Sequence, residues 1–259
     1  MSLAAKSRRP PATAVGVLDR SVAVLDAVEG GARSFTEIVE ATGFTRSTVH
    51  RLIKALEAHG LLAAQGGYRL GPRLLRFAAG AKRDLPLRDL AHPVLEQLTR
   101  TTGESAQLYV RDDAHRICVD SVESSSELRT IVEVGAELPL SAGSAGKVFL
   151  ALGPDRLKQE ALSHTEKLTE RTPVGLTLER QLSIIRKLGY ATSLGEREPG
   201  VGSVSAPILG RDEELIAVVS VSGPESRLGR AAARRYAPAV TGAARDIEVA
   251  MEAGRSQPI

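Results

Sequence analysis

The sequence has a single cysteine, few aromatic residues and no long apolar run. Cys118 has no partner for a disulfide or for a cysteine-rich metal site, so we expect a core position for it, no structural zinc and a cytoplasmic protein. No stretch of about 18 uncharged apolar residues is present, and no apolar segment follows the basic N-terminus. We therefore expect neither a membrane span nor a secretory signal.

The charges are unevenly divided along the chain. The net charge of the 259 residues is only +3, but residues 1–83 contain 13 Lys and Arg against 6 Asp and Glu. Residues 84–259 contain 21 against 25, so a basic module precedes a mildly acidic one. The 42% of hydrophobic residues can form a substantial core. The basic module indicates a polyanion as partner, nucleic acid before membrane.

The basic third of the chain is expected to contain a winged helix-turn-helix. Residues 1–16 are interpreted as a basic arm. Within residues 17–71, three segments have apolar residues at helical spacing, Ser34 and Glu37 fit a capping box, and a Gly pair between two short apolar runs marks a hairpin turn. Three helices and a hairpin in this order are typical of that domain. Residues 72–86 are expected to form a linker helix.

Residues 87–254 are expected to form a second domain of mixed helices and strands. Alternation of apolar and polar residues predicts strands, and apolar residues three and four apart predict helices. Because short loops join neighbouring strands, an antiparallel α+β sheet is favoured over a parallel one. The predicted helices are 87–102, 145–152, 176–188 and 228–253, and the predicted strands are 106–111, 116–122, 128–134, 190–194, 201–208 and 215–222.

The third predicted helix has a polar face suited to DNA. Thr45 is its expected cap, and its buried stripe is Val49, Leu52, Ile53 and Leu56. In a helix-turn-helix the second helix of the motif enters the major groove, where Arg can grip guanine and Ser, Thr or Lys hold phosphate. The expected DNA contacts are Thr45, Arg46, Ser47, Thr48, His50, Arg51, Lys54 and, in the wing, Arg69. The alternative is the solvated face of a protein-binding winged helix.

Two neighbouring strands near the C-terminus bring serines together. In the register that pairs Ile208 with Leu215, Ser203 lies opposite Ser220 and Ser222 shares their face. The opposite face of both strands is apolar and belongs against a core. The serines line either a ligand pocket or the wet face of a half-buried sheet.

The segment 141–146 is the second expected wall of a pocket. Its small residues let a backbone approach a ligand, and Ser144 is expected to cap a helix whose free N–H groups attract a carboxylate. The candidate contacts are Ser141, Ala142, Gly143, Ser144, Ala145 and Gly146. Glu196, in a loop before a Pro-Gly pair, either closes over a ligand or is solvated, and Arg197 beside it could face an acid.

Three enzyme-like patterns in this segment are incomplete. A phosphate-binding loop needs glycine at Ser141 and Ser or Thr at Val148. A Ser-x-x-Lys acylation site, Ser144 with Lys147, lacks its companion motifs, and a nucleophile elbow needs glycine at Ala142. The five histidines have neither metal-ligand nor triad spacing. We therefore expect no catalytic residue, no metal and no cofactor.

The sequence resembles a bacterial regulator family. Thr42-Gly43-Phe44 followed by Ser47–Leu52, and then Tyr68–Gly71, is similar to the N-terminal signature of IclR-type transcriptional regulators. Further landmarks follow in order: Thr102-Gly103-Glu104, Pro139–Ala142 with Gly146-Lys147, Gly189-Tyr190-Ala191, Ala206-Pro207-Ile208 and Ser220–Pro224. The resemblance covers about residues 17–252. It implies a winged helix, a linker helix and a GAF-like effector domain, in a dimer or a dimer of dimers.

One departure from the family pattern affects the expected pocket. Many members have cysteine where Ser203 stands, and often an aspartate near Ser193. The resemblance therefore implies that both positions contact the effector, while the ligand that they select stays open.

The leading interpretation is a transcriptional regulator that controls a catabolic operon in response to a small organic acid. A dimer with two-fold symmetry is expected to bind double-stranded DNA at an imperfect palindrome. Two alternatives remain: a winged helix fused to an acyl-transfer or hydrolytic enzyme, and an architectural DNA binder without an effector. Repression or activation, the operator and the effector stay undetermined.

Overall fold

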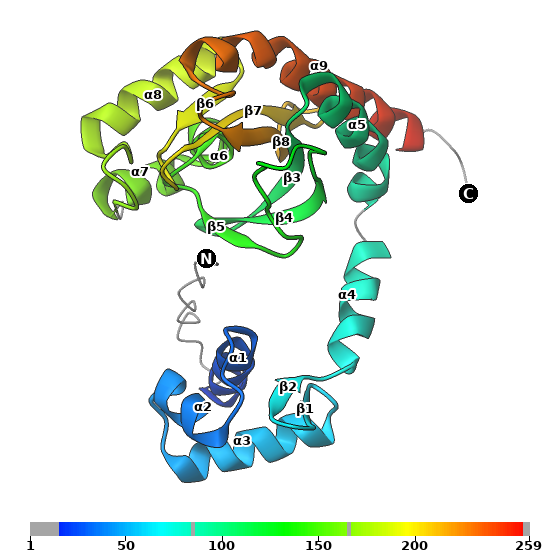
Figure 1. Ribbon diagram of the computed structural model, residues 1–259, viewed down its shortest axis with the longest axis vertical. Coiled ribbons are helices and arrows are strands. Elements are labelled where there is room, and N and C mark those ends of the chain that lie inside the picture. Colours follow the sequence, from blue (N-terminus) through cyan, green and yellow to red (C-terminus); the bar gives the residue numbers. More distant parts are fainter. Residues whose placement is uncertain (1–15, 84–85, 165–166, 256–259) are drawn as a thin grey trace. The chain divides into compact units, whose positions relative to one another are not determined.

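The computed structural model describes residues 16–83, 86–164 and 167–255. Its contacts divide the chain into two compact units, Met1–Leu85 and Pro86–Ile259. The basic arm predicted at residues 1–16 lies outside the described residues except for Gly16. The elements of both units are labelled in Figure 1.

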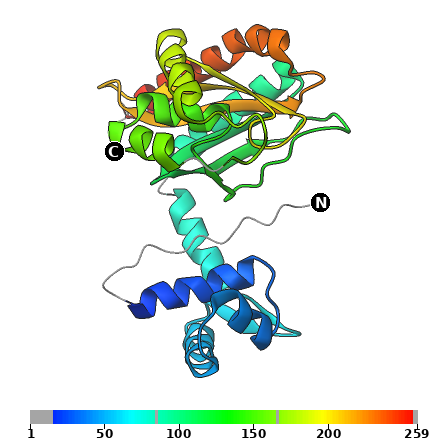
Figure 2. The ribbon, with the colours of Figure 1, turned by 90° about the vertical axis from the view of Figure 1, so that its left-hand side faces the viewer.

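The first unit combines helices with a two-stranded hairpin (Figure 2). In chain order its elements are α1 (Gly16–Glu29), α2 (Phe35–Thr42), α3 (Arg46–Ala58), β1 (Leu62–Ala64), β2 (Tyr68–Leu70) and α4 (Arg73–Arg83). The predicted capping box is confirmed: Ser34 Oγ accepts from the Glu37 amide, and the Glu37 carboxylate accepts from the Ser34 amide. Thr45 caps α3 by accepting from the Thr48 amide.

The first unit has its own apolar core. The stripe predicted for α3 is buried in it, together with Val24, Val28, Ile38 and Leu62. Other apolar side chains remain exposed: Leu18 on α1 is 57% exposed, and Leu75 and Phe77 on α4 are 74% and 54% exposed. Some apolar side chains of α1 and α4 thus lie outside the core of the first unit.

The second unit is built on a six-stranded antiparallel sheet. Its strands are ordered β5-β4-β3-β8-β7-β6. Their bounds are β3 (Ser105–Asp112), β4 (His115–Val122), β5 (Glu137–Pro139), β6 (Ala191–Leu194), β7 (Val201–Leu209) and β8 (Leu215–Pro224). The helices are α5 (Pro86–Thr102), α6 (Ser144–Leu152), α7 (Asp155–His164), α8 (Gly175–Leu188) and α9 (Arg230–Arg255). The expected antiparallel α+β architecture is confirmed.

Helices cover both faces of this sheet (Figure 1). The helices α5 and α9 pack on one face, and α6 and α8 pack on the other. Because side chains alternate along a strand, β8 directs Val219 and Val221 toward the α5–α9 layer. It directs Val218 into the core beside α6 and Ser220 toward the serines of that side. A polar cluster therefore forms on the α6 side, beside an apolar core.

Three elements differ from the sequence-based prediction: the strand expected at residues 128–134, and β5 and α7, which were not predicted. The strand predicted at residues 128–134 is wrong, because residues 135–139 form the backbone hydrogen bonds along the outer edge of β4. The Cys118 amide donates to Ala136 O at 3.0 Å, and the Gly135 amide donates to Cys118 O at 2.7 Å. Alternation alone does not make a strand, since each strand needs a hydrogen-bonded neighbour. The helix α7 was not predicted, because its sequence is mostly polar with little apolar periodicity.

The predicted register of β7 and β8 is also wrong, by two residues. Leu209 pairs with Leu215, and an irregularity next to it inserts one extra residue in β8, so that Ile208 lies opposite Ala217. A shift of two keeps every side chain on its predicted face. Ser203 therefore lies opposite Ser222 and Ser205 opposite Ser220, which adds Ser205 to the cluster.

Candidate functional site

The residues predicted to contact DNA lie along one side of α3 and in the wing. Thr48 is half-buried, and the other seven are exposed. Thr45 and Thr48 already share a hydrogen bond at the cap, with their hydroxyl oxygens 2.9 Å apart. Arg69 belongs to β2, the second strand of the wing. The exposed polar face expected from the sequence is thus present.

The cations of this face differ in their partners. The Arg46 guanidinium lies 4.9 Å from the centre of the Phe35 ring, and Lys54 Nζ lies 3.2 Å from the Glu57 carboxylate. Among the described residues, the Arg51 side chain makes no ion pair or hydrogen bond. Arg51 is therefore the cation of α3 that needs to break the fewest contacts to bind a phosphate or a base.

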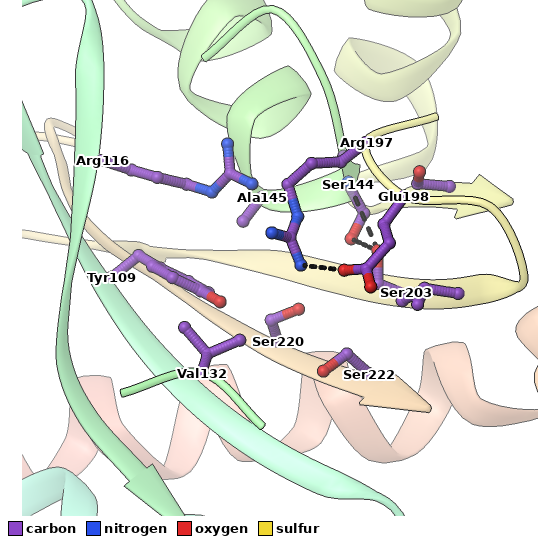
Figure 3. Close-up of a pocket in the computed structure, with 13 residues that line it drawn as sticks. Tyr109, Arg116, Val132, Ser144, Ala145, Arg197, Glu198, Ser203, Ser220 and Ser222 are labelled. Carbon is purple, nitrogen blue, oxygen red and sulfur yellow. Dashed lines mark hydrogen bonds and ion pairs between the residues drawn. The ribbon is translucent and has the colours of Figure 1, made fainter. Parts of the chain in front are cut away.

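The second unit contains a pocket between α6, the sheet and the loop before β7 (Figure 3). Of the residues predicted from the sequence, it is lined by Gly143, Ser144, Ala145, Ser193, Ser203, Ser220 and Ser222. Ser141, Ala142, Gly146 and Glu196 do not line it. Arg197, which the sequence suggested could face an acid, also lines the pocket, and the remaining lining residues are Tyr109, Arg116, Val132, Glu198 and Val201. Predicted residues of three strands, β6, β7 and β8, and of one helix start thus meet here.

The serines form a connected hydrogen-bond network. Ser144 Oγ lies 2.7 Å from Ser203 Oγ and 2.6 Å from Ser205 Oγ, and Ser205 Oγ donates to Ser220 Oγ at 2.8 Å. Ser222 Oγ donates to the side-chain oxygen of Gln107 at 3.1 Å. Ser144 uses its one proton to donate to Ser203, so the proton of Ser203 is available to an acceptor in the pocket, and the single proton of Ser205 serves either Ser144 or Ser220.

The start of α6 differs from the prediction that Ser144 caps it. The cap position is Gly143, without a side-chain hydrogen bond, and Ser144 is the first residue of the helix. The protein supplies the carboxylate at this helix start itself, because the Gly143 amide donates to Glu196 Oε2 at 3.2 Å. Attraction of a ligand by free N–H groups here is therefore weaker than the sequence suggested.

Glu196 also forms a buried ion pair with Lys147. Lys147 Nζ lies 2.5 Å from Glu196 Oε1 and donates to Gln181 Oε1 and Thr192 O. Burial lowers the pKa of Lys147, and the neighbouring Glu196 opposes this shift. The pair ties α6 to the loop that contains Arg197 and Glu198 and so helps to fix one wall of the pocket.

Arg116 is the main residue of the pocket that the sequence-based prediction missed. It is 3% exposed, on the same face of β4 as Cys118. Its guanidinium lies 5.4 Å from the centre of the Tyr109 ring (Figure 3). Burial lowers the pKa of Arg116 to about 10 and raises that of Tyr109 to about 12. The core position predicted for Cys118, two residues away on the same strand, was the signal that could have revealed Arg116.

Cys118 is fully buried, as predicted, and burial raises the pKa of its thiol to about 12. A thiol in this state is a poor nucleophile. Within the described part of the chain, no group of three or more His, Cys, Asp or Glu residues is arranged to hold a metal ion. No helix in the same residues is long and apolar enough to cross a membrane.

Two family models match the chain and together span both units. The model for the IclR helix-turn-helix domain matches residues 17–66, and that for the IclR C-terminal domain of bacterial transcriptional regulators matches residues 80–249. The transcriptional regulator BhcR of Paracoccus denitrificans is 31% identical, over 92% of this chain and 88% of its own length. The transcriptional repressor IclR of Escherichia coli is 28% identical, over 95% of this chain and 96% of its own.

A solved structure gives the same result. An IclR homologue from Microbacterium hydrocarbonoxydans was crystallised in complex with 4-hydroxybenzoate. Its structure matches this chain with a TM-score of 0.79 at 27% identity. The match covers 92% of this chain and 99% of that one. The relatives are named as transcriptional regulators, so the chain is a regulator and not an enzyme. With both of its units matched in order, the chain belongs to the IclR family of bacterial transcriptional regulators and contains that family's helix-turn-helix DNA-binding domain.

Proposed function

We propose that the second unit binds a small organic acid and that this binding changes the affinity of the first unit for its operator. The observation that supports the acid is the pocket lining itself, in which hydroxyl groups and the buried guanidinium of Arg116 outnumber the carboxylates. A donor-rich, cationic pocket complements a guest with acceptor oxygens and negative charge. A family member crystallised with 4-hydroxybenzoate gives independent support for this ligand class.

The proposed ligand is small because few large rings surround the site. Tyr109 is the one aromatic residue of the pocket lining within the described residues. The acid is therefore aliphatic or contains a single aromatic ring. Its binding shifts the populations of two dimer arrangements that space the two reading helices differently. The regulated genes are a catabolic operon whose products consume this acid.

The experiment that tests this function combines operator DNA with a panel of acids. The operator is sought next to the gene, and band shifts are measured with acetate, pyruvate, benzoate and 4-hydroxybenzoate. At least one acid is expected to change the operator affinity and to raise the melting temperature of the full chain. A regulator whose DNA binding and melting temperature respond to none of them would contradict the proposed effector.

Ser203→Ala is expected to weaken binding of the active acid by about 1 kcal/mol or more, roughly five-fold. The reason is the loss of a hydroxyl proton that is free to donate to a charged ligand. Calorimetric titration of wild type and variant measures the change. Ser183→Ala is the matched control, since the Ser183 hydroxyl bonds Glu179 O on the exposed side of α8. Equal affinity in Ser203→Ala and wild type would remove Ser203 from the site.

We further propose that the protein acts as a dimer, or a dimer of dimers, on an imperfect palindrome. The exposed apolar side chains of α1 and α4, among them Leu18, Leu75 and Phe77, support a second copy as their partner, because water-exposed groups of this size favour burial. Footprints are expected to cover two inverted half-sites. A monomer that binds an isolated half-site as tightly as the full operator would contradict this arrangement.

A further inference from the structure

Arg116 lines the pocket and is held in place by backbone carbonyls. Its Nη1 donates to Pro139 O and, at 3.0 Å, to Ala142 O, so backbone carbonyls of two segments hold the guanidinium. Two glycines make room for it. A Cβ on Gly143 would lie 3.0 Å from Nη2, and a Cβ on Gly146 would lie 2.7 Å from Nη1. Figure 3 shows the side chain extending from β4 toward Ala145, across the ring of Tyr109.

The charges around the pocket do not balance. Lys147 is paired with Glu196, and Arg197 Nη2 lies 3.5 Å from the Glu198 carboxylate. Among the described residues, no carboxylate lies within ion-pair distance of Arg116. Three cations thus stand against two carboxylates. The Glu196 carboxylate acts on Arg116 electrostatically but is already bound to Lys147, so the excess positive charge lies on the most deeply buried guanidinium. A buried charge without a counter-ion is costly, and carbonyl dipoles compensate for only part of that cost.

The hydrogen-bonding capacity of Arg116 is also incomplete. Its Nε is buried and has no hydrogen-bond partner among the described residues. A role as a cross-link between β4, β5 and the start of α6 would be met by Nη1 alone. The orphaned Nε–H, on a guanidinium that lines the pocket, instead matches the geometry in which an arginine grips a carboxylate with two parallel N–H groups.

We propose that Arg116 is the residue that binds the carboxylate of the effector, through its Nε and Nη2, and that the pocket therefore takes an acid with one carboxylate. This assignment rests on the proposed function and deepens it. The carboxylate of the acid completes the hydrogen bonds of the guanidinium and supplies its missing counter-charge. The rest of the ligand then extends past Tyr109 toward the serine cluster, where Ser203 has a proton to donate. Arg197 does not have this role, because Glu198 already neutralises it.

The test compares acids with their neutral amides on the full chain. Acetate, pyruvate, benzoate and 4-hydroxybenzoate are each titrated beside the corresponding primary amide, on wild type, Arg116→Gln and Arg197→Gln. The acid that binds wild type is expected to bind at least about 30-fold more tightly than its amide. Arg116→Gln is expected to lose at least about 30-fold in affinity for that acid. Arg197→Gln, which leaves the Glu198 carboxylate of the pocket lining without its partner, is expected to lose clearly less than Arg116→Gln.

A conservative variant separates ligand binding from folding. Arg116→Lys keeps the positive charge but not the two-pronged N–H geometry, and it is expected to bind the acid about ten-fold more weakly than wild type with an unchanged circular dichroism spectrum. It decides the question if Arg116→Gln does not fold. Equal affinity of the acid for wild type and for the Arg116 variants, or a loss confined to Arg197→Gln, would overturn the assignment and leave the proposed acid effector standing. Binding of no acid, or of amides alone, would overturn both.

Discussion

Lys147→Met is expected to lower the free energy of unfolding of the second unit by about 3–5 kcal/mol. The change leaves the Glu196 carboxylate buried without the cation that lies 2.5 Å from it. It also removes the donor to Gln181 Oε1 and Thr192 O. Urea unfolding of the full chain, followed by circular dichroism, measures the loss. The effect is large because the side chains of Lys147 and Glu196 are only 2% and 8% exposed.

Two comparisons show whether this loss comes from the buried pair. The double variant Lys147→Met with Glu196→Gln is expected to regain part of the stability, since no unpaired charge is then buried. Lys158→Met is the control, because Lys158 pairs with the more exposed Glu179 at 3.6 Å and its removal should cost less than about 1 kcal/mol. A Lys147→Met protein as stable as the Lys158→Met protein would show that the pair does not stabilise the pocket wall.

Arg51→Ala is expected to weaken operator binding by about 1–3 kcal/mol, which corresponds to roughly 5- to 150-fold. Arg51 is exposed on α3 and makes no ion pair or hydrogen bond among the described residues. Its removal therefore breaks no such contact within the protein, and the expected effect falls on DNA binding. If it contacts a base, the loss is greater on the operator than on scrambled DNA. If it contacts phosphate, both are weakened alike and the salt dependence becomes shallower.

The measurement is fluorescence anisotropy at fixed salt with operator and scrambled duplexes. Lys54→Ala is expected to have a smaller effect, because Lys54 already pairs with Glu57. Arg180→Ala, an exposed arginine of α8 in the second unit, is the control and should bind like wild type. Unchanged operator affinity in Arg51→Ala would remove this residue from the proposed reading surface.

The sequence predicted best those features that depend on near neighbours in the chain. The capping box of Ser34 and Glu37, the Thr45 cap and the buried stripe of α3 all involve residues within one or two helical turns. Side-chain alternation likewise placed the serines of β7 and β8 on the correct face even though the register was wrong. Local geometry fixes such features, because period and capping need no knowledge of the rest of the fold.

The tertiary structure decided what depends on residues far apart in the chain. Edge pairing by residues 135–139 excluded the strand expected at residues 128–134, since a strand exists only with a bonded neighbour. An irregularity between two strands selected which serines lie opposite each other.

By itself, then, the sequence determined a basic winged helix joined to an α+β domain with a serine-lined face. Only the tertiary structure showed that Glu196 pairs with Lys147, 49 positions away in the chain, and that Arg116 has no such carboxylate partner among the described residues. A side-chain charge can be read from the sequence, but its desolvation and its counter-charge depend on chain segments that meet only in the folded state.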